Sequence, residues 1–434
     1  MKQRIVIKNF GPIANIDIEI SDFMLLIGQQ ASGKSTTAKS IFFFKSLRDD
    51  LLRFVLSELN SKKKPFFKAI GTFAKKVRQK YLDYWGPTFH LDNILLKYYY
   101  TEDIWIEITL EENKKFISPS FSPAFRVKLL NLIESITEEN DRFSNARISF
   151  LTNKDIIQIE NERSLFFHKI ESAINEIFNE DRDLLFIPAG RSLLSTLSEQ
   201  LQTLDTRKLD FLMRTFVERI VNVKQIFNVG IDDLILEKKK LTQDYINKEG
   251  VLAAKELITK ILKGKYKNDK DGEKLFIDAK KFTKLSFSSS GQQESIWILH
   301  LIFLLILENQ KAFIVIEEPE AHLFPVAQND MAELIVLLNN MNNSVIITTH
   351  SPYLLSNFNT LLYANEIGHK HPDEVMKLLP KLFWLDSRKC EMYFIENGEL
   401  VDILEQDINT LKVEMIDQAS TINNKLYNSL FDLD

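Results

Sequence analysis

A loop near the start of the chain matches the phosphate-binding pattern G-x-x-x-x-G-K-[ST] at every fixed position. Its residues, with the one that follows, are Gly28, Gln29, Gln30, Ala31, Ser32, Gly33, Lys34, Ser35 and Thr36. Such a loop turns successive backbone N–H groups toward a phosphate, and a following helix adds the positive end of its dipole. The pattern predicts that Lys34 reaches the β- and γ-phosphates of a nucleotide and that the Ser35 hydroxyl holds Mg²⁺. The alternative is a chance Gly-Lys turn.

The segments around this loop have the required character. Phe23 to Ile27 is an apolar run that predicts a buried strand, and Ser35 to about Leu52 is compatible with a helix. Further upstream, Arg4 to Phe10 and Ile16 to Ile20 alternate as strands do, with a turn at Gly11-Pro12 between them. We therefore expect a strand, loop and helix preceded by an antiparallel pair.

Two acidic residues follow a second apolar run late in the chain. Ala312 to Ile316 predicts a strand buried on both faces, and Glu317 and Glu318 come directly after it. Carboxylates at the C-terminal end of a strand lie where open α/β sheets bind ligands. One carboxylate can orient Mg²⁺ and the next can polarise an attacking water. The alternative is a solvated acidic turn, which would have the same sequence.

Two further segments offer groups that suit a phosphate. Ser289-Ser290-Gly291-Gln292 precedes an apolar helix from Ile296, so a hydroxyl and free N–H groups gather at a helix N-terminus. Ser344 to Thr349 predicts another buried strand, and His350 after it could hydrogen-bond a phosphate or the attacking water. Each has an ordinary alternative, an N-capped loop for the first and a structural histidine for the second.

Composition limits the class of protein. The 434 residues carry a formal charge of −5, so any contact with DNA or RNA needs a local basic patch. Cys390 is the only cysteine, which favours a reducing, cytoplasmic setting. The N-terminus does not resemble a secretory signal. The longest apolar run, Ile296 to Leu307, is too short to cross a bilayer, so we expect a buried helix and no membrane partner.

Between the motifs the sequence predicts mixed structure. The sequence is compatible with helices at Ser46–Leu110 and residues 193–265, and it is hairpin-like at Ile104–Leu110 and Ile148–Ile159. It predicts a buried strand at Leu184–Pro188 and a loop at Lys265–Lys274. We expect a split α/β domain at residues 1–50 and 280–400, an inserted and mainly helical lid at 51–279 whose strand at 184–188 returns to that domain, and a helical tail at 401–434.

In their order and identity the four motifs resemble those of the ABC-type ATPases. Walker A would be Gly28–Ser35, the signature Ser289–Gln292, Walker B Ile314–Glu318, and the switch histidine His350. The D-loop would be Glu320–Leu323. The resemblance implies an α/β fold, an ABC-type ATPase head with a P-loop sheet, an N-terminal antiparallel β-layer and a large, mainly α-helical insertion.

Within that superfamily the chain is most similar to the RecF/SMC/OLD branch. Ile7–Pro12 resembles the "KNF" opening of those proteins, and Glu317–Leu323 resembles their "EEPExHLHP" form. Glu317 stands where Asp is usual, and Phe324 replaces the second His, which argues against a His-pair metal site. Only about 80 residues follow His350, too few for the Toprim nuclease domain of OLD proteins. An associated nuclease would therefore be a separate chain.

The resemblance also implies roles and partners. Lys34, Glu318 and His350 would be catalytic, Ser35 and Glu317 would hold Mg²⁺, and the Walker A and signature residues would bind ATP. The implied partners are a second copy, as a homodimer or higher homo-oligomer, and a separate nuclease or toxin effector, as in anti-phage systems of the Septu or PARIS type. The alternatives are a DNA-repair or chromosome-maintenance ATPase of the RecF/SMC type, which leaves DNA or RNA binding open, and a non-hydrolytic scaffold.

Several weaker candidates have two interpretations each. Arg191 resembles the "PxxR" step of OLD-like ATPases, or forms a surface salt bridge. Arg4 and Lys8 lie near the nucleotide, or are solvated strand residues. A basic and aromatic stretch binds nucleic acid, or is a lid helix with its lysines in solvent. Its members are Lys62, Lys63, Lys64, Phe66, Phe67, Lys68, Phe73, Lys75, Lys76 and Arg78. The glutamine of a Q-loop cannot be identified.

Overall fold

The computed structural model describes residues 2–59, 68–111, 116–149, 156–192, 194, 208–241, 247–278, 280–405 and 409–412. The chain forms two compact units. The first combines Met1–Ile20, Thr36–Leu184 and Asn397–Glu399, and the second combines Ser21–Ser35, Leu185–Glu396 and the described residues from Leu400. These divisions differ from the predicted boundaries at 50, 280 and 400. The role of residues 51–279 as a lid stays a prediction.

The first unit is built on an antiparallel sheet with the strand order β2-β1-β4-β5-β6. Its strands are β1 (Arg4–Phe10), β2 (Ile13–Glu19), β4 (Leu95–Tyr99), β5 (Trp105–Leu110) and β6 (Ile117–Phe121). Alternate residues such as Ile5 and Ile7 are buried, and Arg4 pairs with Glu19 across the first hairpin. The predicted N-terminal antiparallel layer is therefore confirmed.

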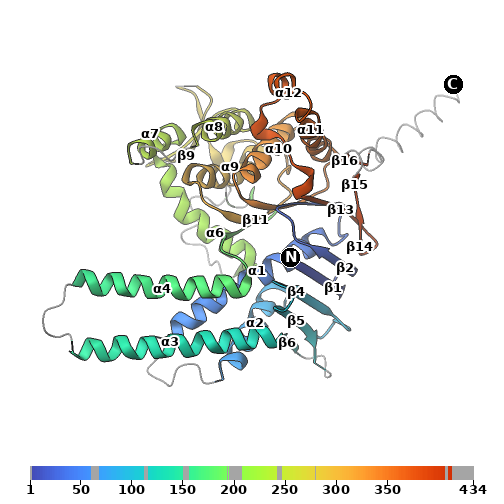
Figure 1. The fold of residues 1–434 in the computed structure, drawn as a ribbon. Coiled ribbons are helices and arrows are strands. Elements are labelled where there is room, and N and C mark those ends of the chain that lie inside the picture. Colours follow the sequence, from blue (N-terminus) through green and yellow to red (C-terminus); the bar gives the residue numbers. More distant parts are fainter. Residues whose placement is uncertain are drawn as a thin grey trace. The chain divides into compact units, whose positions relative to one another are not determined.

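Long helices accompany this sheet: α1 (Lys34–Leu59), α2 (Ala69–Trp85), α3 (Pro123–Ser149) and α4 (Ile156–Phe178). Figure 1 shows α3 and α4 side by side. The core between helices and sheet is aromatic, with Phe44 stacked on Tyr98 at 5.5 Å between ring centroids. The predicted hairpin at Ile148–Ile159 is wrong, because its described ends belong to α3 and α4.

The second unit contains a six-stranded sheet with the order β14-β13-β3-β12-β11-β7. Its strands are β3 (Phe23–Gly28), β7 (Asp183–Ile187), β11 (Ala312–Glu317), β12 (Ser344–Thr349), β13 (Cys390–Glu396) and β14 (Glu399–Asp402). Strands β13, β3, β12 and β11 run parallel. Every residue of β3, β11 and β12 is buried, as their apolar runs predicted. The α/β fold class is confirmed.

Most helices of the second unit gather on one side of this sheet (Figure 1). They are α6 (Phe211–Lys224), α7 (Ile231–Leu241), α8 (Lys248–Leu262), α9 (Ser290–Glu308), α10 (Pro325–Asn340), α11 (Pro352–Gly368) and α12 (Pro372–Leu378). In the described part of the chain α9 alone has the length and apolar composition of a membrane span, but 78% of that window is buried inside the protein. It is the core helix that the sequence predicted at Ile296–Leu307.

Two further predictions of local structure are wrong. Lys265–Lys274 is not a loop but most of a hairpin, β8 (Lys265–Asp269) and β9 (Gly272–Phe276), which β10 (Phe282–Lys284) extends. The segment looks polar because its buried residues include the charged Glu273 and Lys274 beside Tyr266 and Leu275. The described start of the predicted helical tail forms the end of β14, then β15 (Leu404–Glu405) and β16 (Thr410–Leu411). Residues 413–434 lie outside the described residues.

Candidate functional site

Three chemistry-bearing segments meet at one edge of the second unit's sheet. Strand β12 lies between β3 and β11 and runs parallel to both. Glu317 at the end of β11 is in register with Thr348 of β12, and Thr349 is in register with Ile27 of β3. The parallel direction therefore brings the phosphate loop, the paired carboxylates and His350 to the same edge, although more than half of the chain separates the first from the others.

The side chain of Lys34 folds back onto the backbone of the phosphate loop. Lys34 is buried, and its Nζ donates hydrogen bonds of 2.7 Å to the carbonyl oxygens of Gly28 and Gln29. Burial lowers the pKa of Lys34, while the nearby carboxylates of Glu318 and Glu320 act in the opposite direction. A lysine at the start of helix α1, where backbone N–H groups are free, suits a polyanionic ligand.

The paired carboxylates have different environments. Glu317 is buried, and its Oε2 accepts a 3.3 Å hydrogen bond from the backbone N–H of Ala189. Glu318 has a positive φ of 46°, which is uncommon for a residue with a side chain, and its carboxylate is 38% exposed. Its backbone N–H donates to the carbonyl oxygen of Thr348 at 2.9 Å. The backbone turns sharply at Glu318 and presents one carboxylate to solvent, where it could meet a water.

His350 lies beside this exposed carboxylate. Its Nδ1 is 3.7 Å from Glu318 Oε1 and 3.6 Å from Glu320 Oε1. Glu320 is buried and accepts hydrogen bonds from the Thr349 hydroxyl at 2.6 Å and from the His350 backbone N–H at 3.1 Å. Glu320 thus fixes the backbone from which His350 projects. Sequence reasoning placed Glu320 only in a loop, although an acidic residue so close to Glu318 was a signal for it.

The proposed signature segment caps helix α9. The Ser289 hydroxyl accepts from the Gln292 backbone N–H, and Gln292 Oε1 accepts in return from the backbone N–H of Ser289, which makes a capping box. The side chain of Gln292 also donates to the Leu262 carbonyl oxygen at the end of α8, at 2.7 Å. The N-capped loop named as the alternative is therefore present. Ser289 and Ser290 remain exposed on the surface.

Arg191 is fully buried, so the surface salt bridge named as its alternative is wrong. Its guanidinium donates to the carbonyl oxygens of Glu317 at 2.7 Å and Glu318 at 2.9 Å. It also donates to the carbonyl oxygen of Glu294 in α9 at 3.1 Å, and its Nε lies 3.6 Å from the Glu294 carboxylate. Burial lowers the pKa of Arg191, and the surrounding carboxylates, led by Glu294, only partly offset this effect. The arginine is part of the framework that carries the paired carboxylates.

The residues at this edge fit ATP and Mg²⁺. In the described part of the chain, Ser32 Oγ, Glu320 Oε2 and Thr348 Oγ1 are buried oxygens without a hydrogen-bond partner. Buried polar atoms rarely stay unpaired, so these three fit a site that a polar ligand and its waters complete. The described residues contain no group of three or more His, Cys, Asp or Glu side chains able to hold a metal. A metal here would share its ligands with phosphate oxygens, as Mg²⁺ does.

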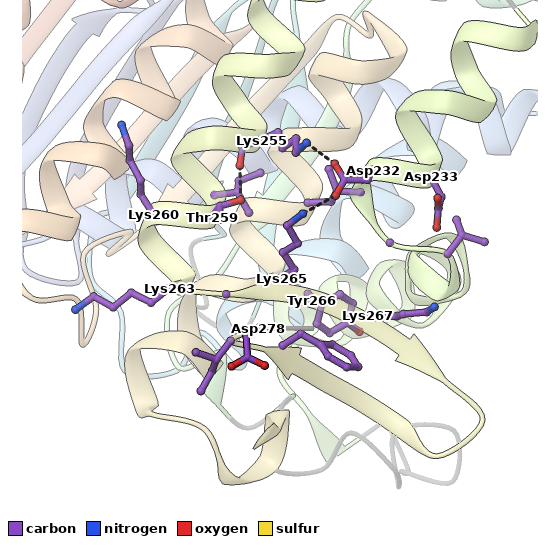
Figure 2. Close-up of a pocket in the computed structure, with 17 residues that line it drawn as sticks. Asp232, Asp233, Lys255, Thr259, Lys260, Lys263, Lys265, Tyr266, Lys267 and Asp278 are labelled. Carbon is purple, nitrogen blue, oxygen red and sulfur yellow. Dashed lines mark hydrogen bonds and ion pairs between the residues drawn. The ribbon is translucent and has the colours of Figure 1, made fainter. Parts of the chain in front are cut away.

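A large cavity lies elsewhere in the second unit. It has a volume of about 840 Å³ and is lined by the start of α7, the second half of α8 and strands β8 and β9. In Figure 2 Asp232 accepts from Lys255 and Lys265, while Lys260 and Lys263 point away from that pair. No residue of the four motifs lines this cavity. Two of these lysines are already paired with Asp232 and two point away, so the cavity does not resemble a phosphate site.

The remaining weak candidates lie in the first unit. Arg4 forms a partly exposed ion pair with Asp17, and Lys8 is exposed. On α2, Phe73 is buried, Lys75 and Lys76 are exposed, and Arg78 pairs with Glu111. This part of the basic and aromatic stretch has the amphipathic pattern of an ordinary surface helix. Residues 62–64, 66 and 67 lie outside the described residues.

Three solved structures are similar to the chain at low sequence identity. The SmcHead bound to the C-winged helix domain of ScpA is 12% identical with a TM-score of 0.39, over 93% of this chain and 98% of that one. The SMC head domain from Thermotoga maritima is 11% identical with a TM-score of 0.36, over the same shares. The Smc head domain with an extended coiled coil, bound to the C-terminal domain of ScpA derived from Pyrococcus furiosus, is 12% identical with a TM-score of 0.37, over 98% of each chain.

No curated protein matches the chain. The model of one family, described as the AAA ATPase domain, matches residues 1–355. That match contains the phosphate loop, the buried Arg191, the signature segment, the paired carboxylates and His350, which are the residues that the geometry brings into one unit. With most of its length matched, the chain belongs to the AAA ATPase domain family.

Proposed function

We propose that this ATPase hydrolyses ATP in a Mg²⁺-dependent reaction at the edge of the sheet where β3, β11 and β12 end. The observation that carries the proposal is the position of Glu318. Its partly exposed carboxylate lies 3.7 Å from His350 Nδ1 and acts on the pKa of Lys34, so a base, a polar orienting group and a phosphate-binding cation share one edge.

The residues of this site have separate roles in the proposed reaction. Lys34 exchanges its two carbonyl acceptors for phosphate oxygens and stabilises the charge that develops on them. Glu318 accepts a proton from the attacking water, and His350 orients that water or the γ-phosphate. Ser35 and Glu317 are the residues that would hold Mg²⁺, which supplies positive charge to the phosphates.

We further propose that a second copy of the chain completes the site. The exposed Ser289 and Ser290 would face the nucleotide bound by the partner, so that each composite site combines one Walker A loop with the other subunit's signature. Exposed apolar side chains support a protein partner at this surface. Phe287, just before the signature, is 79% exposed, and Phe324, just after the D-loop, is 75% exposed. Binding of ATP would join the two copies, and hydrolysis would release them.

The motif resemblance supports a role in anti-phage defence, in which the ATPase controls a separate nuclease or toxin. The alternative is DNA repair or chromosome maintenance, for which a DNA-binding surface on the first unit would be needed. Phage plating on cells with and without the gene and its neighbours tests the first. Stimulation of ATP turnover by DNA ends tests the second.

The direct experiment on the enzymatic proposal is phosphate release from ATP by the purified chain, with Mg²⁺ and with EDTA. Turnover with Mg²⁺ that EDTA abolishes is the expected result. A protein that binds ATP and never releases phosphate would support the scaffold alternative instead.

A further inference from the structure

The turn after strand β7 is built around one buried arginine. In this turn, Pro188-Ala189-Gly190-Arg191, the backbone N–H of Ala189 donates to the Glu317 carboxylate and the Arg191 guanidinium donates to the Pro188 carbonyl oxygen. The same guanidinium reaches the carbonyl oxygens of Glu317 and Glu318 at 2.7 and 2.9 Å. The backbone on both sides of the Glu317–Glu318 peptide is therefore held from one side chain.

Arg191 also holds the helix that begins with the signature. Its backbone N–H donates to the Glu294 carboxylate at 2.9 Å, and its Nε donates to the Glu294 carbonyl oxygen at 3.1 Å. Glu294 lies three residues after Gly291, within the first two turns of α9. One guanidinium thus bridges the Walker B backbone and the signature helix. All of these atoms belong to the second unit.

We propose that Arg191 is a positioning residue that couples the Walker B carboxylates of a subunit to the signature helix of the same subunit. The inference rests on the proposed composite dimer for its consequence. In such a dimer a subunit's Walker B serves one nucleotide site and its signature serves the other, so Arg191 links the two sites. A shift of α9 by the partner's nucleotide would reach Glu318 through a rigid, multiply bonded side chain.

The geometry requires an arginine. A guanidinium has five N–H donors in one plane and can reach carbonyl groups on different sides, whereas a lysine ammonium is a single point with three donors. Arg191→Lys keeps the buried charge opposite Glu294 and loses part of the bonding to Glu317, Glu318 or α9. This variant weakens the bridge while it limits the damage of an uncompensated buried Glu294.

The first test compares Arg191→Lys with Arg48→Lys. Arg48 is a largely buried arginine of the first unit that likewise donates to backbone carbonyl oxygens, those of Glu180 and Arg182, and it touches no motif. We expect Arg191→Lys to keep its ATP Kd within about threefold and to lose at least about tenfold in kcat, because the base is misplaced and the phosphate loop is not. Arg48→Lys should keep both values. Parental kcat in Arg191→Lys, or equal losses in the two variants, would overturn the proposal.

The second test isolates the coupling. A heterodimer purified through two affinity tags carries one Lys34→Ala subunit and one parent subunit, so only the site with the parent's Walker A turns over ATP. Adding Arg191→Lys to the Lys34→Ala subunit leaves the active site's own Lys34, Glu317 and Glu318 unchanged and alters the subunit that donates the signature. We expect turnover to fall by about fivefold or more. Equal turnover in the two heterodimers would overturn the coupling.

If the proposed ATP hydrolysis is wrong, the result differs from a failure of the coupling, because the parent protein itself would then release no phosphate. In that case hydrogen–deuterium exchange decides the coupling. Faster exchange in the peptides containing Gly291 and Glu318, in Arg191→Lys and not in Arg48→Lys, supports it. Unchanged exchange at either peptide would contradict it.

Discussion

Gly291 and the carbonyl oxygen of His322 approach so closely that a Cβ at Gly291 would lie 2.5 Å from that oxygen. The second position of the signature helix is therefore packed against the loop that follows the paired carboxylates in the same chain. Any side chain at Gly291 would displace this loop. A test of the signature as a phosphate-binding surface must leave Gly291 intact and use the exposed Ser290 instead.

Ser290→Asp should lower kcat/KM for ATP by at least about tenfold. The added carboxylate lies at the first turn of α9, where it interacts favourably with the helix dipole, so the fold should be kept. In a composite site the same charge would face the partner's ATP phosphates and repel them. Thermal unfolding and ATP kinetics of Ser290→Asp and of the control Ser290→Asn measure the two effects separately.

Mixing experiments extend this prediction to the dimer. Inactive Lys34→Ala protein mixed with Ser290→Asp protein can form hybrids in which one site has both an intact Walker A and an intact signature. We expect phosphate release to reappear on mixing. If Ser290→Asp alone retains parental turnover, the serine does not face a nucleotide and the composite site is wrong.

Lys34→Ala should reduce ATP turnover by at least about a hundredfold and weaken ATP binding, because the variant removes the cation that stabilises the transferring phosphoryl group. Isothermal titration and phosphate release check the two parts. Lys377→Ala, in the short helix α12, provides a matched loss of one positive charge that should change neither. Turnover of Lys34→Ala within tenfold of the parent would remove the phosphate loop from the reaction.

Replacing exposed aromatic residues beside the signature should weaken the ATP-bound dimer. Phe287→Ser and Phe324→Ser each remove an apolar side chain that is solvated in one chain and would be buried between two, so dissociation of the dimer should rise by about tenfold or more. Light scattering with ATP and Glu318→Gln protein provides the measurement. Phe89→Ser is the control, because Phe89 is 76% exposed and belongs to the first unit. Equal effects of all three changes would argue against this interface.

Stability should depend on pH through His300. This histidine is fully buried in α9 against Phe227, and burial lowers its pKa from 6.5 to about 4. The unfolded state then binds more protons than the folded state between these pKa values, so stability is complete above about pH 6.5 and falls as the pH approaches 4. Between pH 7 and 5 we expect a loss of about 2 kcal/mol.

Denaturant unfolding of the parent and of His300→Phe at the two pH values measures this term. The phenylalanine variant should lose about 2 kcal/mol less on acidification, since its side chain does not titrate. The exposed His168 is the control position, and His168→Gln should behave as the parent does. An identical pH dependence in the parent and His300→Phe would show that another group is responsible.

Sequence patterns identified the segments that carry the candidate site residues more clearly than the contacts that hold those segments together. Short sequence patterns were enough to single out Lys34 and to predict the strands before Glu317 and His350. The phosphate-loop pattern and an apolar run can both be recognised within a few neighbouring residues. Arg191 remained ambiguous, since the carbonyl oxygens that it binds lie more than a hundred residues away. The contact of Gly291 with His322 could not be predicted either, because the two residues are not neighbours in sequence and meet only in the folded chain.

The errors in local structure have a related cause. The segment around Tyr266 was interpreted as a loop because lysines and aspartates dominate it, although it forms strands β8 and β9 and buries some of its charged residues as well as Tyr266. The segment around Ile148 was interpreted as hairpin-like, whereas its described ends lie in the helices α3 and α4. A short stretch of sequence does not determine its own secondary structure, because packing against distant parts of the chain can override its local propensity.

The central claim is that Glu318 activates the water that attacks ATP, and one comparison tests it most directly. Single-turnover hydrolysis and ATP binding are measured for the parent, Glu318→Gln and Glu317→Gln. We predict that Glu318→Gln binds ATP with nearly parental affinity and hydrolyses it at least about a hundredfold more slowly, and that its ATP-bound dimer accumulates. Parental hydrolysis by Glu318→Gln, with the loss seen in Glu317→Gln instead, would contradict the assignment of the two carboxylates.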